Sequence, residues 1–229
     1  MTTTTPLRDL SMAELALQYP NAIAVFNKYH LDYCCGGKDS LAKACGETNL
    51  GLEQIEKEIV LTTTPARGTM TFEQWSPSLL ADYIQEQHHG YVRAAIPLIE
   101  QLLAKVVHKH GASHRELEEI HACFLSLSQE LTSHMGKEEQ VLFPAIKQRA
   151  GWASTALELP ISIMVDEHQK AGDLIKQIRR FTHNYQPPAN ACTSFQALYL
   201  KLEEFDNDLM QHVHLENNIL FPKVLAGTV

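Results

Sequence analysis

The chain has 229 residues, of which 45% are hydrophobic and 20% are charged, and its mean hydropathy is −0.18. This is the composition of a globular protein, and the length is ample for a buried core. No apolar run approaches the roughly 18 residues of a membrane helix, and the first residues resemble neither an export nor a transit signal. We therefore expect a cytoplasmic protein without a membrane contact.

Charge and cysteine content argue against two further classes. The 27 acidic residues outnumber the 19 basic ones, for a net charge of −8, so we expect no nucleic-acid partner. Five cysteines is an odd number in a chain without an export signal, which favours a reducing compartment over a disulfide framework. The twelve histidines are the unusual feature of the composition.

Residues 1–61 are predicted to form a small helical domain. Ser11 and Glu14 have the spacing of a capping box at the start of a helix. Residues 62–71 are rich in threonine and contain a proline and a glycine, with no helical or strand period. We interpret this stretch as a flexible linker to a second domain at 72–229.

The second domain is predicted to contain four long helices, separated by loops at 108–114, 150–160 and 183–192. Its apolar positions recur in steps of three and four, which is the period of the inward seams of a four-helix bundle. Three of the seams are Leu117, Ile120, Phe124, Leu127, Leu131, His134, Glu138, Val141, Ala145; Ile161, Val165, His168, Ala171, Ile175, Ile178; and Leu198, Leu202, Phe205, Leu209, His212, Glu216, Ile219.

An internal repeat relates the two halves of this domain. The segments HMGKEEQVLFP (134–144) and HVHLENNILFP (212–222) share the pattern HxxxExxxLFP, 78 residues apart. His89 and His168, each in an apolar seam, are 79 residues apart. The repeat predicts two helix pairs related by an approximate two-fold axis, with a site on that axis.

Histidine and glutamate in an apolar seam require a partner that offsets their desolvation. The i,i+4 spacing places a histidine and a glutamate of each repeat on one helix face. Four imidazoles and two carboxylates suit a pair of divalent first-row metal ions with open positions. The candidate ligands are His89, His134, Glu138, His168, His212 and Glu216.

Two alternatives accompany this interpretation. For a single histidine, a surface salt bridge or a satisfied core position is the commoner arrangement, but six residues on matched seams of a duplicated motif favour the metal site. His88 also faces an apolar stripe, formed by Ile84, Tyr91, Ala95 and Leu98. The repeat offset favours His89.

Residues 73–226, with these six positions, resemble the hemerythrin-like HHE cation-binding domain. Residues 7–60 resemble the N-terminal domain of the ScdA/YtfE/DnrN group, whose mark is DYCCGG, here residues 32–37. Together they indicate the repair of iron centers (RIC) family. The resemblance implies a hemerythrin-like bundle with two non-haem irons, oxo- and carboxylate-bridged, with Glu138 and Glu216 as bridging ligands. It also implies partners that are iron–sulfur proteins damaged by nitric oxide or peroxide.

Cys34 and Cys35 stand in the DYCCGG motif. Adjacent thiols seldom form a mutual disulfide because the ring is strained, and the two following glycines allow close approach of another molecule. We predict a role for both thiols in iron transfer or electron relay. The alternative is two small buried hydrophobic residues in a turn.

The predicted function is repair of damaged iron–sulfur clusters by iron donation. Two alternatives need the same six ligands: a nitric oxide reductase, which would make the protein an enzyme, and a hemerythrin-like sensor of O₂ or NO or an iron store. Exposed thiols could also join two chains, so a homodimer is a further expectation.

Overall fold

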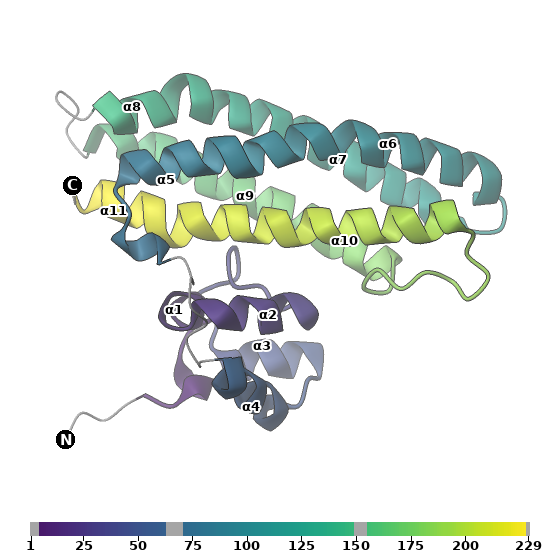
Figure 1. Cartoon of the computed structure of the whole chain (residues 1–229), viewed down its shortest axis with the longest axis horizontal. Helices are drawn as coiled ribbons and strands as arrows, with labels where there is room; N and C mark the ends of the chain where they lie inside the picture. Colours follow the sequence, from purple (N-terminus) through teal and green to yellow (C-terminus); the bar gives the residue numbers. More distant parts are fainter. Residues whose placement is uncertain (1–4, 63–70, 149–154, 228–229) are drawn as a thin grey trace.

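The computed structural model describes residues 5–62, 71–148 and 155–227. Within these ranges the chain is helical, with one isolated bridge between Ser11 and Ser40, so the predicted all-α fold is confirmed. Figure 1 shows a small N-terminal module below a bundle of long helical rods. Most of the predicted linker 62–71 lies outside the described residues, and its flexibility stays a prediction. Among the described residues, no helix is long and apolar enough to cross a membrane.

The N-terminal module packs short helices around its own apolar residues. Helix α1 begins with the predicted capping box, in which Ser11 and Glu14 bond to each other's backbone amides. Met12, Leu15 and Phe26 are fully buried. The helices are η1 (Leu7–Asp9), α1 (Met12–Gln18), η2 (Pro20–Ala22), α2 (Ile23–Lys28), α3 (Leu41–Thr48) and α4 (Leu52–Thr62).

Each rod of the bundle is one helix or a run of α and π segments. After η3 (Phe72–Gln74), the first rod is α5 (Pro77–Tyr83), η4 (Ile84–His89) and α6 (Gly90–His110). The second is α7 (Glu116–Lys137), η5 (Glu138–Leu142) and α8 (Phe143–Gln148). The third is α9 (Thr155–Phe181), and the fourth is α10 (Thr193–His214), η6 (Leu215–Leu220) and α11 (Phe221–Leu225).

Two predicted loops are partly wrong. The first is the predicted loop 108–114, because α6 continues through His110. Residues 155–160 of the predicted loop 150–160 form the first turns of α9, while 150–154 lie outside the described residues. Leu157 and Ile161 pack into the apolar cluster at this end of the bundle. Pro160 removes one backbone hydrogen bond near the helix start, and the burial of these side chains outweighs that loss.

Two predicted seam positions are also wrong. Val141 is 59% exposed, whereas Leu142 is buried. The π-helical segment η5 adds a residue to the turn and shifts the inward face by one position. In α9, Val165 is exposed and Met164 is buried. The step after Ile161 is therefore three residues, and not the four that the predicted seam contains.

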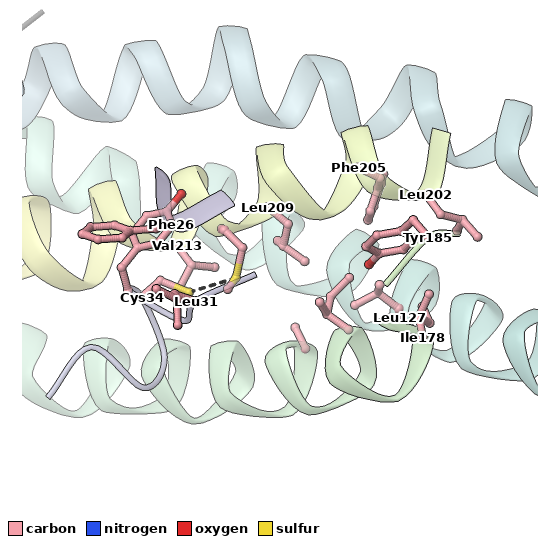
Figure 2. Packing of buried hydrophobic residues seen from close by; sticks show 14 of the residues in the cluster. Phe26, Leu31, Cys34, Leu127, Ile178, Tyr185, Leu202, Phe205, Leu209 and Val213 are labelled. Atoms are coloured by element: carbon pink, nitrogen blue, oxygen red, sulfur yellow. Dashed lines mark hydrogen bonds between the residues drawn. The ribbon is translucent and has the colours of Figure 1, made fainter. Parts of the chain in front are cut away.

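The DYCCGG loop lies against the bundle. Phe26, Leu31 and Cys34 of the module share one apolar cluster with Leu209 and Val213 of α10, as Figure 2 shows. The loop is also held by polar contacts: Lys176 Nζ lies 3.0 Å from Asp32 Oδ2, Arg179 donates to the His30 carbonyl at 2.9 Å, and Asn218 donates to the Tyr33 carbonyl at 3.1 Å.

Arg179 is itself fixed inside the structure. Its guanidinium donates to both carboxylate oxygens of the buried Asp206, at 2.6 and 2.7 Å, and Tyr185 donates to the same carboxylate at 2.7 Å. A buried bidentate pair of this kind orients the donor that reaches His30. The loop is therefore positioned by the bundle as well as by its own module.

Candidate metal centre

The four rods bring the six candidate ligands together at the centre of the bundle. All six are buried. They form two groups whose ligand atoms lie within 4.8 Å of one another: one group contains His89 and His212, the other His134 and His168, and both contain Glu138 and Glu216. Each group could hold one metal ion, with the two glutamates shared between them.

The distances support a bridging position for each carboxylate. Glu138 Oε2 lies 3.3 Å from His89 Nε2 and 3.4 Å from His134 Nε2, so it contacts one histidine of each group. Glu216 likewise lies 3.0 Å from His168 Nε2 and 3.1 Å from His212 Nε2. A carboxylate that faces both groups is suited to join two metal ions.

Several of the donor atoms lack a hydrogen-bond partner, which fits a role as metal ligands. Both oxygens of Glu138, one oxygen of Glu216 and His89 Nε2 are buried without a hydrogen-bond partner in the described structure. Buried polar atoms are normally satisfied, and a carboxylate without partners carries a large desolvation cost. Cations bound between these atoms would supply the missing interactions.

The electrostatics of the metal-free cluster are those of opposite charges packed together. Burial alone would lower the pKa of His134, but Glu138, Glu216 and Glu167 outweigh burial and raise it to about 9. Burial alone would raise the pKa of Glu216, but His212 and His168 hold it well below its usual range. The cluster thus favours the charged form of Glu216, which is the form that binds metal.

Each ligand histidine points Nε2 at the centre and Nδ1 away from it. His89 Nδ1 lies 2.7 Å from Glu139, and His134 Nδ1 lies 2.9 Å from Glu167. His168 Nδ1 lies 2.8 Å from the amide oxygen of Asn217. Such partners fix the ring orientation and the tautomer of a metal-binding histidine.

His88 and His89 are both buried, but they face different neighbours. His88 Nδ1 lies 3.0 Å from Asp208 Oδ1, and its ring stacks on His212 with 5.5 Å between centroids. The group of candidate ligands contains His89 and not His88. His88 therefore packs behind His212, and His89 stays the predicted ligand.

Three π-helical segments coincide with the candidate ligands. Segment η4 ends at His89, η5 begins at Glu138, and η6 contains Glu216. A π turn widens the helix and is frequent at functional sites. Near His168, α9 continues as a regular helix, so the two halves of the repeat differ at this point.

A cavity of about 320 Å³ borders one side of the centre. His134, His168, Lys137 and Glu167 are among the residues that line it. Glu167 pairs with Lys137 as well as with His134, and these two charges lower its pKa against the opposing effect of burial. The cavity gives small molecules or ions an approach to the group that contains His134 and His168.

The two cysteines of the DYCCGG motif lie close to this centre. Cys35 Sγ lies 3.3 Å from the backbone carbonyl of His168. A Cβ atom at Gly172 would lie 3.0 Å from that sulfur, so the glycine makes room for the thiol. Cys34 is buried, which corrects the expectation of two exposed thiols, while Cys35 is half-buried.

Sequence reasoning missed two of the residues behind the ligands. Glu139 and Asn217 each follow a candidate bridging glutamate, at equivalent positions of the repeat. The repeat itself was the signal that could have found them. Met210, whose sulfur lies 3.4 Å from Cys34 Sγ, carried no such signal.

Comparison with known proteins agrees with this geometry. Residues 80–224 match the hemerythrin HHE cation binding domain, and residues 8–61 match ScdA_N, a domain of unknown function. The chain is 42% identical over 224 residues to proteins of Citrobacter koseri and Escherichia coli named iron–sulfur cluster repair protein YtfE, covering 96% of this chain and 98% of each relative.

The hemerythrin-like bundle and the buried histidines and glutamates together define the cofactor as a pair of non-haem irons. Both matched domains occur in the expected order, and the similarity to the YtfE proteins runs through almost the whole chain. The chain therefore belongs to the hemerythrin HHE family, in the YtfE-like group that carries an N-terminal ScdA_N domain.

Proposed function

We propose that this protein repairs iron–sulfur clusters damaged by oxidative or nitrosative stress by donating iron to them. The observation that carries the proposal is a centre of two metal positions, one of which borders a cavity while its histidine contacts a thiol-bearing loop. The names of the relatives support the same activity. In this proposal the iron is the cargo, and the protein is its carrier.

The proposal gives each candidate ligand a role. His89 and His212 would hold one iron, His134 and His168 would hold the other, and Glu138 and Glu216 would be shared between the two. When bound, the irons supply redox chemistry and open positions for small ligands. The chain contributes four imidazoles and two carboxylates, all buried, and a cavity that borders His134 and His168.

Glu167 and Lys137 stand where an ion from the cavity-side position would pass. Glu167 holds His134 at Nδ1 and faces the cavity, with Lys137 paired to it. Because its carboxylate is charged and only partly buried, it can attract a cation that leaves the histidines. Cys34 and Cys35 act next, as thiols that accept iron or supply electrons beside His168.

The test is reactivation of a [4Fe–4S] enzyme after treatment with nitric oxide or peroxide. We expect iron-loaded wild-type protein to restore its activity, and a Glu138→Ala variant to fail because it cannot hold iron. A Cys34→Ala/Cys35→Ala variant should load iron normally and restore activity poorly. Cys45→Ala is the matched control, since Cys45 is a buried thiol in α3 of the same module.

Two outcomes would each refute one part of the proposal. Reactivation by the metal-free Glu138→Ala variant would mean that the iron does not come from this centre. Full reactivation by the double cysteine variant would remove the thiol role and leave iron donation from the centre intact. The two parts of the proposal therefore fail separately.

Nitric oxide reduction is a second candidate function, favoured by the cavity beside His134 and His168. This cavity can admit a diatomic molecule to open positions of a reduced centre. An anaerobic assay for nitrous oxide with excess reductant separates the two functions. Repeated turnover would establish an enzyme. An iron donor need produce no nitrous oxide.

We also propose that the protein acts in the cytoplasm, on damaged iron–sulfur proteins, with O₂ or NO as small ligands. All five cysteines lie in the described ranges and are free thiols, which suits a reducing compartment. A homodimer remains a proposal; because Cys34 is buried and Cys35 half-buried, it should be sought under reducing conditions.

A further inference from the structure

Four donor side chains converge where the DYCCGG loop meets α10. Cys34 Sγ lies 3.5 Å from Asp32 Oδ1, 3.5 Å from Cys35 Sγ and 3.4 Å from Met210 Sδ. The ligand atoms of the first three residues all lie within 4.8 Å of one another. We call Asp32, Cys34, Cys35 and Met210 the thiol cluster.

Asp32, Cys34 and Cys35 have the spacing of ligands on a single ion, and Met210 lies beside Cys34. Thiolate sulfurs bind first-row metals at about 2.3 Å, so two sulfurs on one tetrahedral ion lie about 3.7 Å apart. Two thiols and a thioether are soft donors, and the carboxylate is a hard one. This mixture fits a divalent first-row ion, ferrous iron included.

The charges around the thiol cluster balance when an ion is bound. Burial raises the pKa of Cys34 well above its usual range, with Cys35 and Asp32 adding to the effect, so in the metal-free protein this thiol is neutral. A divalent ion held by both sulfurs as thiolates and by the Asp32 carboxylate would have three anionic donors. The ion and the ammonium of Lys176, 3.0 Å from Asp32, offset these three charges.

The thiol cluster also lies between the metal centre and the surface. On one side, Cys35 contacts the backbone carbonyl of His168. On the other, Asp32 and Lys176 line an open cavity of about 650 Å³. Met210 comes from the bundle, whereas the other three residues come from the module, so the donor set is complete when the loop rests on α10.

We propose that the thiol cluster is a mononuclear metal site that receives ferrous iron from the centre of the bundle and presents it to a client at the open cavity. The use of this site in repair rests on the iron donation proposed above. Its existence as a metal site rests on the four donors alone.

The test is an anaerobic titration of metal-free protein with cobalt(II), which reports thiolate ligands by a charge-transfer band. We expect three cobalt ions per wild-type chain, with a thiolate band that belongs to one of them. A Cys34→Ser/Cys35→Ser variant should bind two and show no band. The control Cys45→Ser should match wild type, because Cys45 lies buried in α3, outside the cluster.

A second pair of variants leaves every thiol in place. Gly172→Ala puts a methyl group 3.0 Å from Cys35 Sγ, whereas Gly46→Ala in α3 meets no atom within 4 Å. We expect Gly172→Ala to weaken cobalt binding at the thiolate site and Gly46→Ala to leave it unchanged. These variants keep the proposal testable if the serine variant folds poorly.

A wild-type chain that binds two cobalt ions without a thiolate band would overturn the site. So would a band that persists in the serine variant. If the band appears and the double cysteine variant still repairs clusters fully, the metal site stands and its role in donation fails. If the band is absent and repair still requires the thiols, the metal site fails and the proposed function stands.

Discussion

The two halves of the bundle repeat one motif and surround their metal positions differently. A phenylalanine of the repeat stacks on a histidine of each position, Phe143 on His89 and Phe221 on His168. The position formed by His89 and His212, which we call the enclosed position, also has the ring of His88 stacked on His212. The position formed by His134 and His168 borders a cavity instead.

The difference extends to the partners of the ligands. His89 donates to Glu139, a carboxylate that Arg93 also contacts at 2.5 Å, whereas the equivalent His168 donates to the neutral amide of Asn217. A carboxylate partner makes an imidazole a stronger ligand than an amide does. The cavity-side position also has one histidine with a carboxylate partner, since His134 Nδ1 lies 2.9 Å from Glu167. We therefore expect access through the cavity to decide which position gives up its iron.

The largest expected effect is the loss of both metal positions. Glu216→Ala takes one shared carboxylate from both positions, so we expect the iron content to fall from about two per chain to near zero. Metal analysis of protein from iron-replete cells, with circular dichroism as a check of folding, measures it. Glu158→Ala, an exposed glutamate in α9, should keep both irons. Full iron content in Glu216→Ala would disprove the bridging role.

Single histidine variants should separate the two positions. His134→Ala should leave iron at the enclosed position, and His89→Ala should leave it at the cavity side. We expect each to hold about one iron, and we expect a ferrous chelator to extract it more slowly from His134→Ala, because the enclosed position lacks an approach through the cavity. Equal extraction rates from the two variants would show that the cavity does not govern release.

The sequence predicted the ligands because the chemistry leaves a local signal. Histidine and glutamate four residues apart, in an apolar seam and repeated 78 residues later, specify a face and a partner face without any knowledge of the fold. The helical class followed from the same periodicity. His89 was distinguished from His88 by the repeat offset.

What the sequence could not predict depends on non-local contacts. The exposure of Val141 follows from the π turn in η5. A pattern with a period of 3.6 residues does not predict the extra residue of a π turn. The burial of Cys34 and its contact with Met210 join residues 176 positions apart. The docking of the loop on Arg179 and Lys176 likewise needs the folded bundle.

The metal-free protein should lose stability as the pH rises from about 6.5 to about 9. The pKa of His134 is raised to about 9 by Glu138 and its neighbours despite burial, so the folded state binds this proton more tightly than the unfolded chain. The stabilisation is complete below about pH 6.5 and is lost through pH 9, by at most about 3 kcal/mol.

Urea unfolding of metal-free protein across that range measures the effect. His134→Gln should flatten the profile, and His108→Gln, an exposed histidine in α6, should leave it unchanged. Iron-loaded protein should show no such loss, because the metal takes the place of the proton. A profile that is already flat in the metal-free wild type would contradict the charge state assigned to the cavity-side ligands.

The smallest expected effect comes from exchanging the residues that contact Nδ1 of His89 and of His168. Glu139→Gln gives the enclosed position a neutral partner like that of Asn217, and should weaken its metal affinity by about tenfold, or about 1.4 kcal/mol. Asn217→Asp gives the cavity-side position a carboxylate and should slow chelator extraction there. In the double variant the two positions should converge in extraction rate. If Glu139→Gln instead accelerates loss from both positions equally, the partner acts on the shared carboxylates and the two sites are not independently tuned.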